Sequence, residues 1–369
     1  MKMKISTITP LHVGSGSEYG AQEFYKASAS GKEVLVRADI NKLFLMLPDE
    51  LKDEFIIRLE EPQFKLQPFL QEVMSKLPKG SLGKIRIYFS YLESKFPDSI
   101  AEHVKTSHQA YIPGSSIKGS VKTALLHDMV GSGDIKRMKR LFRRSRRDDK
   151  AEIRRRGSQK FQDDFFSSNP KKAPSTSIMR FLQITDTKPV AKMAIHSINS
   201  VKAGKNGWTW YRHSEDAGKT FIESIGKGNQ LEFEMNLNQK DEIIRKLGLD
   251  YKKEYLSLER ILECIYRFSD DLIENEIDFA QKYRIDFLED FYHEISSQNT
   301  AKSPIMNIGQ GTGFLASTIG LKIREEDGGI YDKVREATKR RTYSDEFPKT
   351  RKVIMEEMVP MGWVKVDKI

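Results

Sequence analysis

The amino-acid sequence predicts an α+β protein with an antiparallel sheet, because strand patterns and helix patterns occupy separate stretches of the chain. Glycine turns at Gly204–Gly207 and Gly226–Gly228 separate short apolar segments, which is typical of hairpins between antiparallel strands. Residues 240–298 instead repeat apolar side chains at helical spacing, from Leu258 to Ile295. We therefore expect an antiparallel sheet joined to long helices.

Composition supports a globular protein. The chain has 369 residues, of which 38% are hydrophobic and 10% aromatic, and this is enough to bury a sizeable core. No uncharged apolar run approaches the length of a membrane span, and the first residues lack the apolar core of a signal peptide. Cys264 is the single cysteine and lies among apolar residues at helical spacing, so we expect a buried structural thiol. These observations predict a cytoplasmic protein without a membrane partner.

The remaining elements follow from local patterns. Residues 2–13 predict a strand that breaks near Pro10 and faces the interior through Ile5 and Ile8. Asp39 is a good N-cap for a helix that continues to Leu47. Residues 49–79 predict short helices separated by prolines. Further strands are expected at Val34–Ala38, Lys84–Ser90, Met179–Thr185, Ile195–Val201 and near Gly362–Val366.

Residues 111–126 are the strongest candidate for an anion site. Pro113 and Gly114 end the preceding segment, and Ser115 or Ser116 can then cap a helix. The first turn of that helix offers free N–H groups and Lys118, followed by Gly119 and by Lys122 one turn on. A phosphate suits these donors. The alternative is an ordinary helix start with its lysines in water.

Two glycine-rich segments indicate backbone that approaches another group closely. Gly14, Ser15 and Gly16 follow the first strand, where their N–H groups can form an anion-binding nest. His12 beside them can stack on a base, pair with phosphate or act as acid or base, or it can be a hydrogen-bonded structural residue. The alternating glycines of the second segment are Gly309, Gly311 and Gly313.

The basic residues are concentrated in one segment. The chain has a formal net charge of +10, and residues 136–160 contain thirteen Lys or Arg against three acids, so this segment carries the whole imbalance. It includes Arg143 and Arg144. So many neighbouring cations repel one another unless they are neutralised, and phosphates of RNA or DNA are the leading explanation. A solvated face and a membrane-surface helix are the alternatives.

Trp208, Trp210 and Tyr211 form an aromatic group near Lys205 and Arg212. Such a group can stack on bases. Packing between neighbouring strands explains it equally well.

The order of these motifs resembles the RAMP superfamily of CRISPR proteins. A first strand leads into His12-Val-Gly-Ser-Gly16, the segment Ile112-Pro-Gly-Ser-Ser-Ile-Lys-Gly119 follows about a hundred residues later, and Gly309-Gln-Gly-Thr-Gly-Phe314 comes near the end. Phe347-Pro-Lys-Thr350 and Gly362-Trp-Val364 complete the set. Within the superfamily, the chain is most similar to the fifth Csm subunit of type III-A effector complexes, and the resemblance spans nearly the whole chain.

The resemblance implies a modified ferredoxin-like or RNA-recognition-motif core enlarged by insertions. We expect one RAMP domain over residues 1–369, with helical insertions at 40–80 and 240–300 and a basic insertion at 131–175. The implied partners are guide RNA (crRNA), the other Csm subunits, especially the backbone RAMP subunits, and host nucleases. The resemblance implies a non-catalytic subunit that caps the complex near the 3′ portion of the guide and is needed for guide maturation. The RNA-facing candidates are His12, Gly14, Ser15, Gly16, Ser115, Ser116, Lys118, Gly119, Lys122, Gly309, Gly311 and Gly313, with Arg143 and Arg144 added for their charge alone.

Two other functions remain open from the sequence. A metal-independent RNA endonuclease would need a base and a cation near the scissile phosphate, and His12 with Lys118 is the pair we would nominate. A nucleotide-binding module is disfavoured because the glycine spacing around Lys118 is not that of a Walker loop. Asp39 and Asp186 are available as a cleaving aspartate, but a helix cap and a turn explain them. No catalytic residue, metal ligand or cofactor is therefore assigned.

Overall fold

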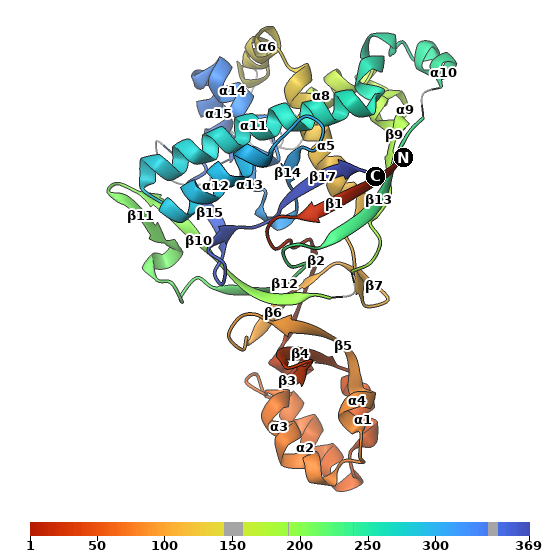
Figure 1. The fold of residues 1–369 in the computed structure, drawn as a ribbon, viewed down its shortest axis with the longest axis vertical. Coiled ribbons are helices and arrows are strands. Elements are labelled where there is room, and N and C mark those ends of the chain that lie inside the picture. Colours follow the sequence, from red (N-terminus) through yellow and green to blue (C-terminus); the bar gives the residue numbers. More distant parts are fainter. Residues whose placement is uncertain (144–157, 191, 239, 339–345) are drawn as a thin grey trace.

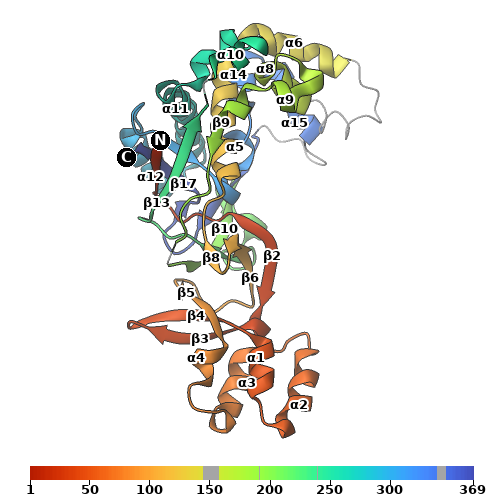
Figure 2. The same ribbon diagram turned by 90° about the vertical axis from the view of Figure 1, so that its right-hand side faces the viewer.

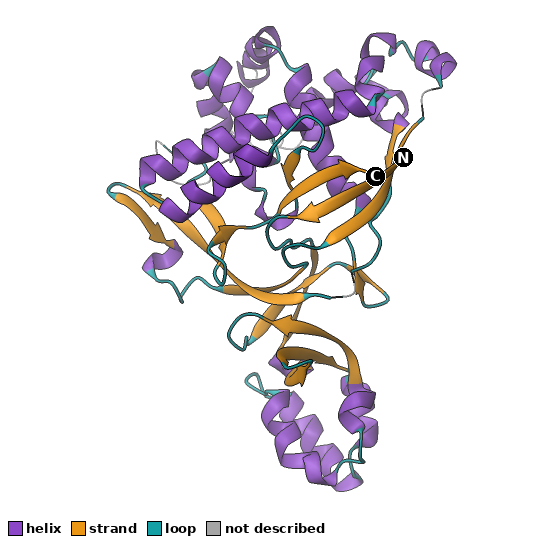
Figure 3. Cartoon of the chain, viewed as in Figure 1, coloured by secondary structure: helices purple, strands orange, loops and turns teal. Residues whose placement is uncertain are grey.

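The computed structural model describes residues 1–143, 158–190, 192–238, 240–338 and 346–369. In this part of the chain, helices pack against two sheets in which antiparallel pairing predominates, and the predicted α+β class is confirmed (Figures 1 and 3). No helix within these ranges is both long and apolar enough to cross a membrane.

The described strands are β1 (Lys2–Thr7), β2 (Gly14–Gly20), β3 (Phe24–Ala29), β4 (Lys32–Ala38), β5 (Arg86–Leu92), β6 (Ser99–His103), β7 (Lys105–Thr106), β8 (Gln109–Ala110), β9 (Leu182–Ile184), β10 (Ala194–Gly204), β11 (Gly207–Trp210), β12 (Thr220–Ser224), β13 (Gln230–Leu237), β14 (Ile305–Asn307), β15 (Thr350–Ile354), β16 (Val359–Pro360) and β17 (Trp363–Lys368).

The described α-helices are α1 (Ile40–Met46), α2 (Asp49–Leu59), α3 (Leu66–Val73), α4 (Ser81–Ile85), α5 (Gly114–Met129), α6 (Ser132–Arg143), α8 (Ser158–Phe166), α9 (Ala173–Thr176), α10 (Asp241–Lys246), α11 (Leu258–Tyr283), α12 (Asp286–Gln298), α13 (Gly313–Ala316), α14 (Gly320–Glu326) and α15 (Gly328–Thr338). Short 3-10 turns join several of them, including η9 (Gly309–Gly311).

The five-stranded sheet has the order β14-β17-β1-β13-β9, and every neighbouring pair in it is antiparallel. Without β14, its strands occur along the chain as β1, β9, β13 and β17, with α5 after the first strand and α11 after the third. This is a βαββαβ unit with the strand order 4-1-3-2, which is the ferredoxin-like arrangement. The remaining elements are inserted between its strands and helices.

The core of this unit lies between the sheet and its two helices. Strand β1 alternates buried and more exposed residues, so that Met3 and Ile5 face inward. They belong to one apolar cluster with Ile117 and Val121 of α5 and Ile261 of α11. The apolar face of α5 that contains Ile117 and Val121 therefore packs on the sheet.

A second sheet connects the core to a projecting lobe. Its central path is β2-β6-β12-β10-β5-β4-β3, and β15 also pairs with β10. Residues 24–92, from β3 to β5 with α1–α4 between them, project from the rest of the molecule (Figures 1 and 2). This lobe has its own apolar cluster, in which the rings of Phe55 and Phe69 stack at 4.8 Å.

Several local predictions are confirmed. Asp39 caps α1 by accepting a hydrogen bond from the Lys42 backbone N–H at 3.0 Å. The glycine turn at Gly204–Gly207 joins β10 and β11. The final strand is β17.

The expected helical insertion at 240–300 contains α11, which the topology places in the core, so we restrict the added helices there to α10 and α12.

The hairpin expected at Gly226–Gly228 is not formed. Strand β12 pairs with β10 and β6, whereas β13 pairs with β1 and β9, so the two strands belong to different sheets. The turn carries the chain from one sheet to the other. Leu231, Phe233 and Met235 still share a buried face, as their alternation predicts.

Candidate nucleic-acid interface

The first turn of α5 is occupied by the chain itself. The helix begins at Gly114 without a side-chain cap, so the predicted capping by Ser115 or Ser116 is wrong. Instead, the Gly114 N–H donates to Asp186 Oδ1 at 2.8 Å. A Cβ atom on Gly114 would lie 2.4 Å from the Ile184 carbonyl oxygen, so the segment before Asp186 closes over this end of the helix. The carboxylate of Asp186 supplies the negative charge that a helix N-terminus favours.

The two lysines of α5 are half-buried. Lys118 Nζ donates to the Leu182 carbonyl oxygen at 2.6 Å, and Lys122 Nζ lies 5.2 Å from the centre of the Phe166 ring. Burial lowers the pKa of Lys118, and its neighbour Lys122 lowers it further. Burial also lowers the pKa of Lys122, an effect that the nearby Asp163 carboxylate opposes. Neither lysine forms a salt bridge with a carboxylate in the described residues, although the charge of Asp163 acts on Lys122.

The exposed side of α5 consists of small residues near its start. Ser115 and Gly119 are exposed one turn apart, and a Cβ atom on Gly119 would meet nothing within 4 Å. Ser116 is half-buried. Lys118 and Lys122 lie along one side of this strip, because they are also one turn apart on the helix. An extended polymer can therefore approach the helix backbone closely beside two cations.

The glycine-rich loop after β14 contacts the chain's own backbone. Gly309 has a φ of +80°, and a Cβ atom there would lie 2.4 Å from the His12 carbonyl oxygen. A Cβ atom on Gly311 would lie 2.3 Å from the Met361 carbonyl oxygen. The Gln310 N–H donates to the His12 carbonyl oxygen at 2.9 Å. The close approach inferred from these two glycines is real, but its partner is protein. Gly313, with a φ of +59°, has open space around it.

These contacts bring the predicted segments together. The loop at Gly309 lies against residue 12, and Ser120 Oγ of α5 donates to the Asn307 carbonyl oxygen at 3.3 Å. The chain around His12, the first half of α5 and the loop at 307–313 therefore form one continuous region, although nearly two hundred residues separate α5 from the loop.

His12 lies beneath this region. It is 1% exposed, its Nδ1 lies 2.6 Å from the Glu223 carbonyl oxygen, and burial lowers its pKa. The neighbouring His103 accepts from the Val13 N–H through Nδ1, and its Nε2 faces the Tyr111 carbonyl oxygen at 3.0 Å. Burial lowers the pKa of His103 to about 3. His12 therefore has a structural role, and the geometry does not support stacking on a base or pairing with Lys118 for catalysis.

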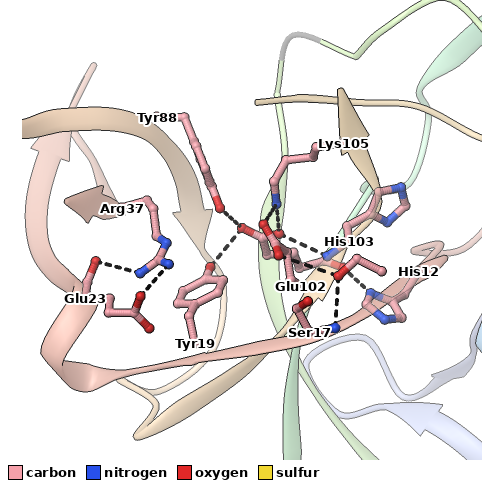
Figure 4. A network of polar contacts seen from close by, with 11 residues as sticks. His12, Ser17, Tyr19, Glu23, Arg37, Tyr88, Glu102, His103 and Lys105 are labelled. Carbon is pink, nitrogen blue, oxygen red and sulfur yellow. Dashed lines mark hydrogen bonds and ion pairs between the residues drawn. The ribbon is translucent and has the colours of Figure 1, made fainter. Parts of the chain in front are cut away.

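A buried carboxylate organises the surroundings of these histidines. Glu223 Oε1 accepts from the hydroxyls of Tyr19 and Tyr88, each at 2.8 Å (Figure 4). Its Oε2 accepts from the His103 N–H at 3.0 Å and from Lys105 Nζ. Glu223 is fully buried and Lys105 nearly so. This network joins β2, β5, β6 and β12, and its polar atoms are engaged with one another.

Gly14, Ser15 and Gly16 remain accessible. They open β2, which is an edge strand of the second sheet, and all three are exposed. Gly16 has a φ of +90°, and the pairing of β2 with β6 is interrupted between Gly14 and Glu18. Ser15 Oγ accepts from the Ser17 N–H at 3.1 Å. The segment is thus an exposed and irregular edge of the second sheet.

The open face of the core sheet is poorly suited to stacking on bases. Strand β1 presents Lys2, Lys4 and Ser6, while β13 presents Glu232 and Glu234. Lys4 lies 3.8 Å from Asp367 of β17 and Lys188 lies 2.5 Å from Glu232. RNA-recognition motifs place aromatic side chains on this face. Here it carries balanced charges, so we place the candidate interface at the loops and α5.

A pocket of about 160 Å³ adjoins the glycine-rich loop. It is lined by Asn307, Gln310 to Ala316, part of β15 and the start of β17. Lys352 lines it, and burial lowers its pKa. Asn307 and Lys352 could not be predicted, because nothing in the local sequence indicates that a strand lysine and a strand asparagine share a pocket.

The structure does not add the aromatic group around Trp208 or the basic residues Arg143 and Arg144 to this region. Trp208 packs edge-on against Trp210 at 5.1 Å and against Phe287 of α12 at 5.8 Å, which favours the packing interpretation. Arg143 ends α6, and Arg144 with most of the basic segment lies outside the described residues.

Comparison with known proteins gives a matching family, a relative and two solved structures that are similar to this chain. The model of the RAMP superfamily matches residues 4–315. The chain is 21% identical to the CRISPR system Cms protein Csm5 of Methanocaldococcus jannaschii, over all of this chain and 89% of the relative.

Two solved structures share the fold. A chain of a cryo-EM structure of a Csm–crRNA–target RNA ternary complex from a type III-A CRISPR–Cas system matches with a TM-score of 0.72 and 21% identity, covering 100% of both chains. The crystal structure of T. onnurineus Csm5 matches with a TM-score of 0.61 and 19% identity, covering 98% of this chain and 99% of that one. The βαββαβ core and the family match over most of the chain lead to one conclusion: this protein is a member of the RAMP superfamily.

Proposed function

We propose that this chain is the fifth Csm subunit, Csm5, of a type III-A CRISPR effector complex and that it binds guide RNA without cutting it. The main support is the correspondence along the whole chain with a subunit of a Csm–crRNA–target RNA complex. Within the complex, it would cap the end near the 3′ portion of the guide, contact the backbone RAMP subunits and support guide maturation by recruiting host nucleases.

The geometry supports RNA binding through the phosphate backbone. Lys118 and Lys122 are half-buried cations without a salt bridge in the described residues, and they lie beside the exposed Gly119. Contacts of this kind position a nucleic acid without reading its sequence. A guide whose sequence varies needs such contacts.

The geometry also favours a role without catalysis. His12, the one base nominated from the sequence, is buried and hydrogen-bonded to the Glu223 backbone. Lys118 is engaged with the Leu182 carbonyl oxygen. Cleavage of RNA needs a base with access to a 2′-hydroxyl, and His12 has no such access.

Replacing Lys118 and Lys122 by glutamine is expected to weaken binding of single-stranded RNA and to make it less dependent on salt. Each phosphate contact contributes about 0.7 to the slope of log K against log salt concentration for single strands, so the double variant should lose about 1.4. Fluorescence anisotropy over a salt series measures this slope. Lys246→Gln is the control, because Lys246 is exposed on α10 and paired with Glu242 at 2.6 Å. An unchanged slope in the double variant would contradict the proposal.

Gly119→Gln is expected to stabilise the protein while weakening RNA binding. Glycine inside a helix costs roughly 0.5–1 kcal/mol relative to good helix formers, and the added side chain meets open space. The same side chain would occupy the strip that RNA approaches. Thermal unfolding and anisotropy on one sample separate the two effects. Higher stability with unchanged RNA affinity would show that RNA does not approach this face.

A further inference from the structure

The pocket beside the glycine-rich loop is lined by two residues with a polar group that has no partner among the described residues. It lies where the loop after β14, strand β15 and the start of β17 meet, and Phe314 and Trp363 form part of its apolar wall. Its volume of about 160 Å³ is below that of typical cofactor pockets, and it suits a group the size of one sugar.

Asn307 is the first of these groups. The residue lines the pocket and is 6% exposed. Asn307 Nδ2 donates to the Met361 carbonyl oxygen at 3.1 Å, which fixes the orientation of the amide. The other amide atom, Oδ1, is buried and accepts no hydrogen bond from the residues that the structure describes. Buried polar atoms of this kind are rare, and each calls for a partner, here a donor within the pocket.

Lys352 is the second group. It lies on β15 and lines the same pocket, and among the described residues it has no acidic partner. Burial lowers its pKa, so its charge is maintained at a cost that a bound anion would offset. The acid of the pocket, Glu276, is already paired with Arg351. A ligand for this pocket therefore carries a negative charge next to a neutral donor.

We propose that the pocket binds the ribose of one nucleotide of a single-stranded RNA, with the ribose 2′-hydroxyl donating to Asn307 Oδ1 and the adjacent phosphate contacting Lys352. This rests on the proposed RNA-binding function and goes beyond it, because it makes the pocket the place where RNA is distinguished from DNA. The 2′-hydroxyl is present in every ribonucleotide next to a phosphate, so this contact selects RNA without selecting sequence. Ser120 Oγ of α5 donates to the Asn307 carbonyl oxygen, so the pocket adjoins the helix that carries Lys118 and Lys122.

The test is a scan of one RNA with single 2′-deoxy substitutions against the unchanged full-length protein. One position is expected to lose about 3–10-fold in affinity, the usual effect of one hydrogen bond. With Asn307→Ala, the same RNA should bind more weakly and the substitution should have no further effect. Lys352→Gln should reduce the salt slope by about 0.7. Asn238→Ala and Lys246→Gln, both exposed, serve as matched controls, and thermal unfolding verifies that each variant is folded.

The outcomes separate this inference from the proposed function. If the unchanged protein binds no RNA, the proposed function and the pocket assignment both fail. If it binds RNA but tolerates every 2′-deoxy substitution, or if the sensitive position stays sensitive in Asn307→Ala, only the pocket assignment is overturned. Dependence of the Asn307 effect on the exocyclic amine of one base, in place of the sugar, would also overturn it.

Discussion

Replacing Glu223 by alanine is expected to lower the free energy of unfolding by about 3–5 kcal/mol. The substitution leaves Lys105 buried without its main partner, and removal of one member of a buried ion pair has a cost of this size. It also deprives the hydroxyls of Tyr19 and Tyr88 of their acceptor. Urea unfolding followed by circular dichroism measures the change.

A double-mutant cycle shows how much of this cost comes from the uncompensated charge. Glu223→Ala combined with Lys105→Met should recover part of the loss, because the buried ammonium is then absent. Glu102→Ala is the control. Glu102 Oε1 also lies 3.2 Å from Lys105 Nζ, but its side chain is 30% exposed, so the expected cost is below about 1 kcal/mol. A similar loss for Glu102→Ala and Glu223→Ala would contradict the central role of Glu223.

Gly309→Ala is expected to destabilise the protein by about 2–4 kcal/mol. A positive φ costs about 1 kcal/mol for alanine, and overpacking adds about 1–3 kcal/mol because the new Cβ atom would meet the His12 carbonyl oxygen, which is backbone and cannot rotate away. The same urea unfolding measures it.

Gly313→Ala is the matched control for this prediction. Its φ of +59° imposes a similar backbone strain, but nothing lies within 4 Å of the added atom, so a loss of about 1 kcal/mol is expected. The difference between the two variants reports the contact between the loop and residue 12. Equal losses of stability in the two variants would show that backbone strain alone accounts for the effect of Gly309→Ala. They would contradict a close contact between the loop at Gly309 and residue 12.

Much of the fold could be predicted from sequence because the signals are local. The cap at Asp39 and the turn at Gly204–Gly207 depend on neighbouring residues and are confirmed. The turn at Gly226–Gly228 has the same local chemistry as a hairpin, yet it joins different sheets. Strand pairing is decided by distant partners, here β1 and β10, and no local pattern shows them.

The candidate site shows the same limit. Glycine spacing correctly indicated close backbone approach at Gly309 and Gly311, but it does not reveal whose backbone approaches. The local sequence predicts an open anion site at the start of α5, because Asp186, which occupies it, lies some seventy residues later in the chain. Burial of His12 and the shared pocket of Asn307 and Lys352 are likewise products of tertiary packing.

The position of β1 in the core sheet has a consequence for synthesis on the ribosome. Met3 pairs with Phe233 on one side and with Lys368 on the other. The core sheet can therefore form completely only after almost the entire chain has been synthesised. The lobe at residues 24–92 makes its contacts within about seventy residues and can fold while the rest is still being translated. Stalled or truncated chains should therefore carry a folded lobe attached to an open core, whose exposed apolar strands are natural substrates for chaperones.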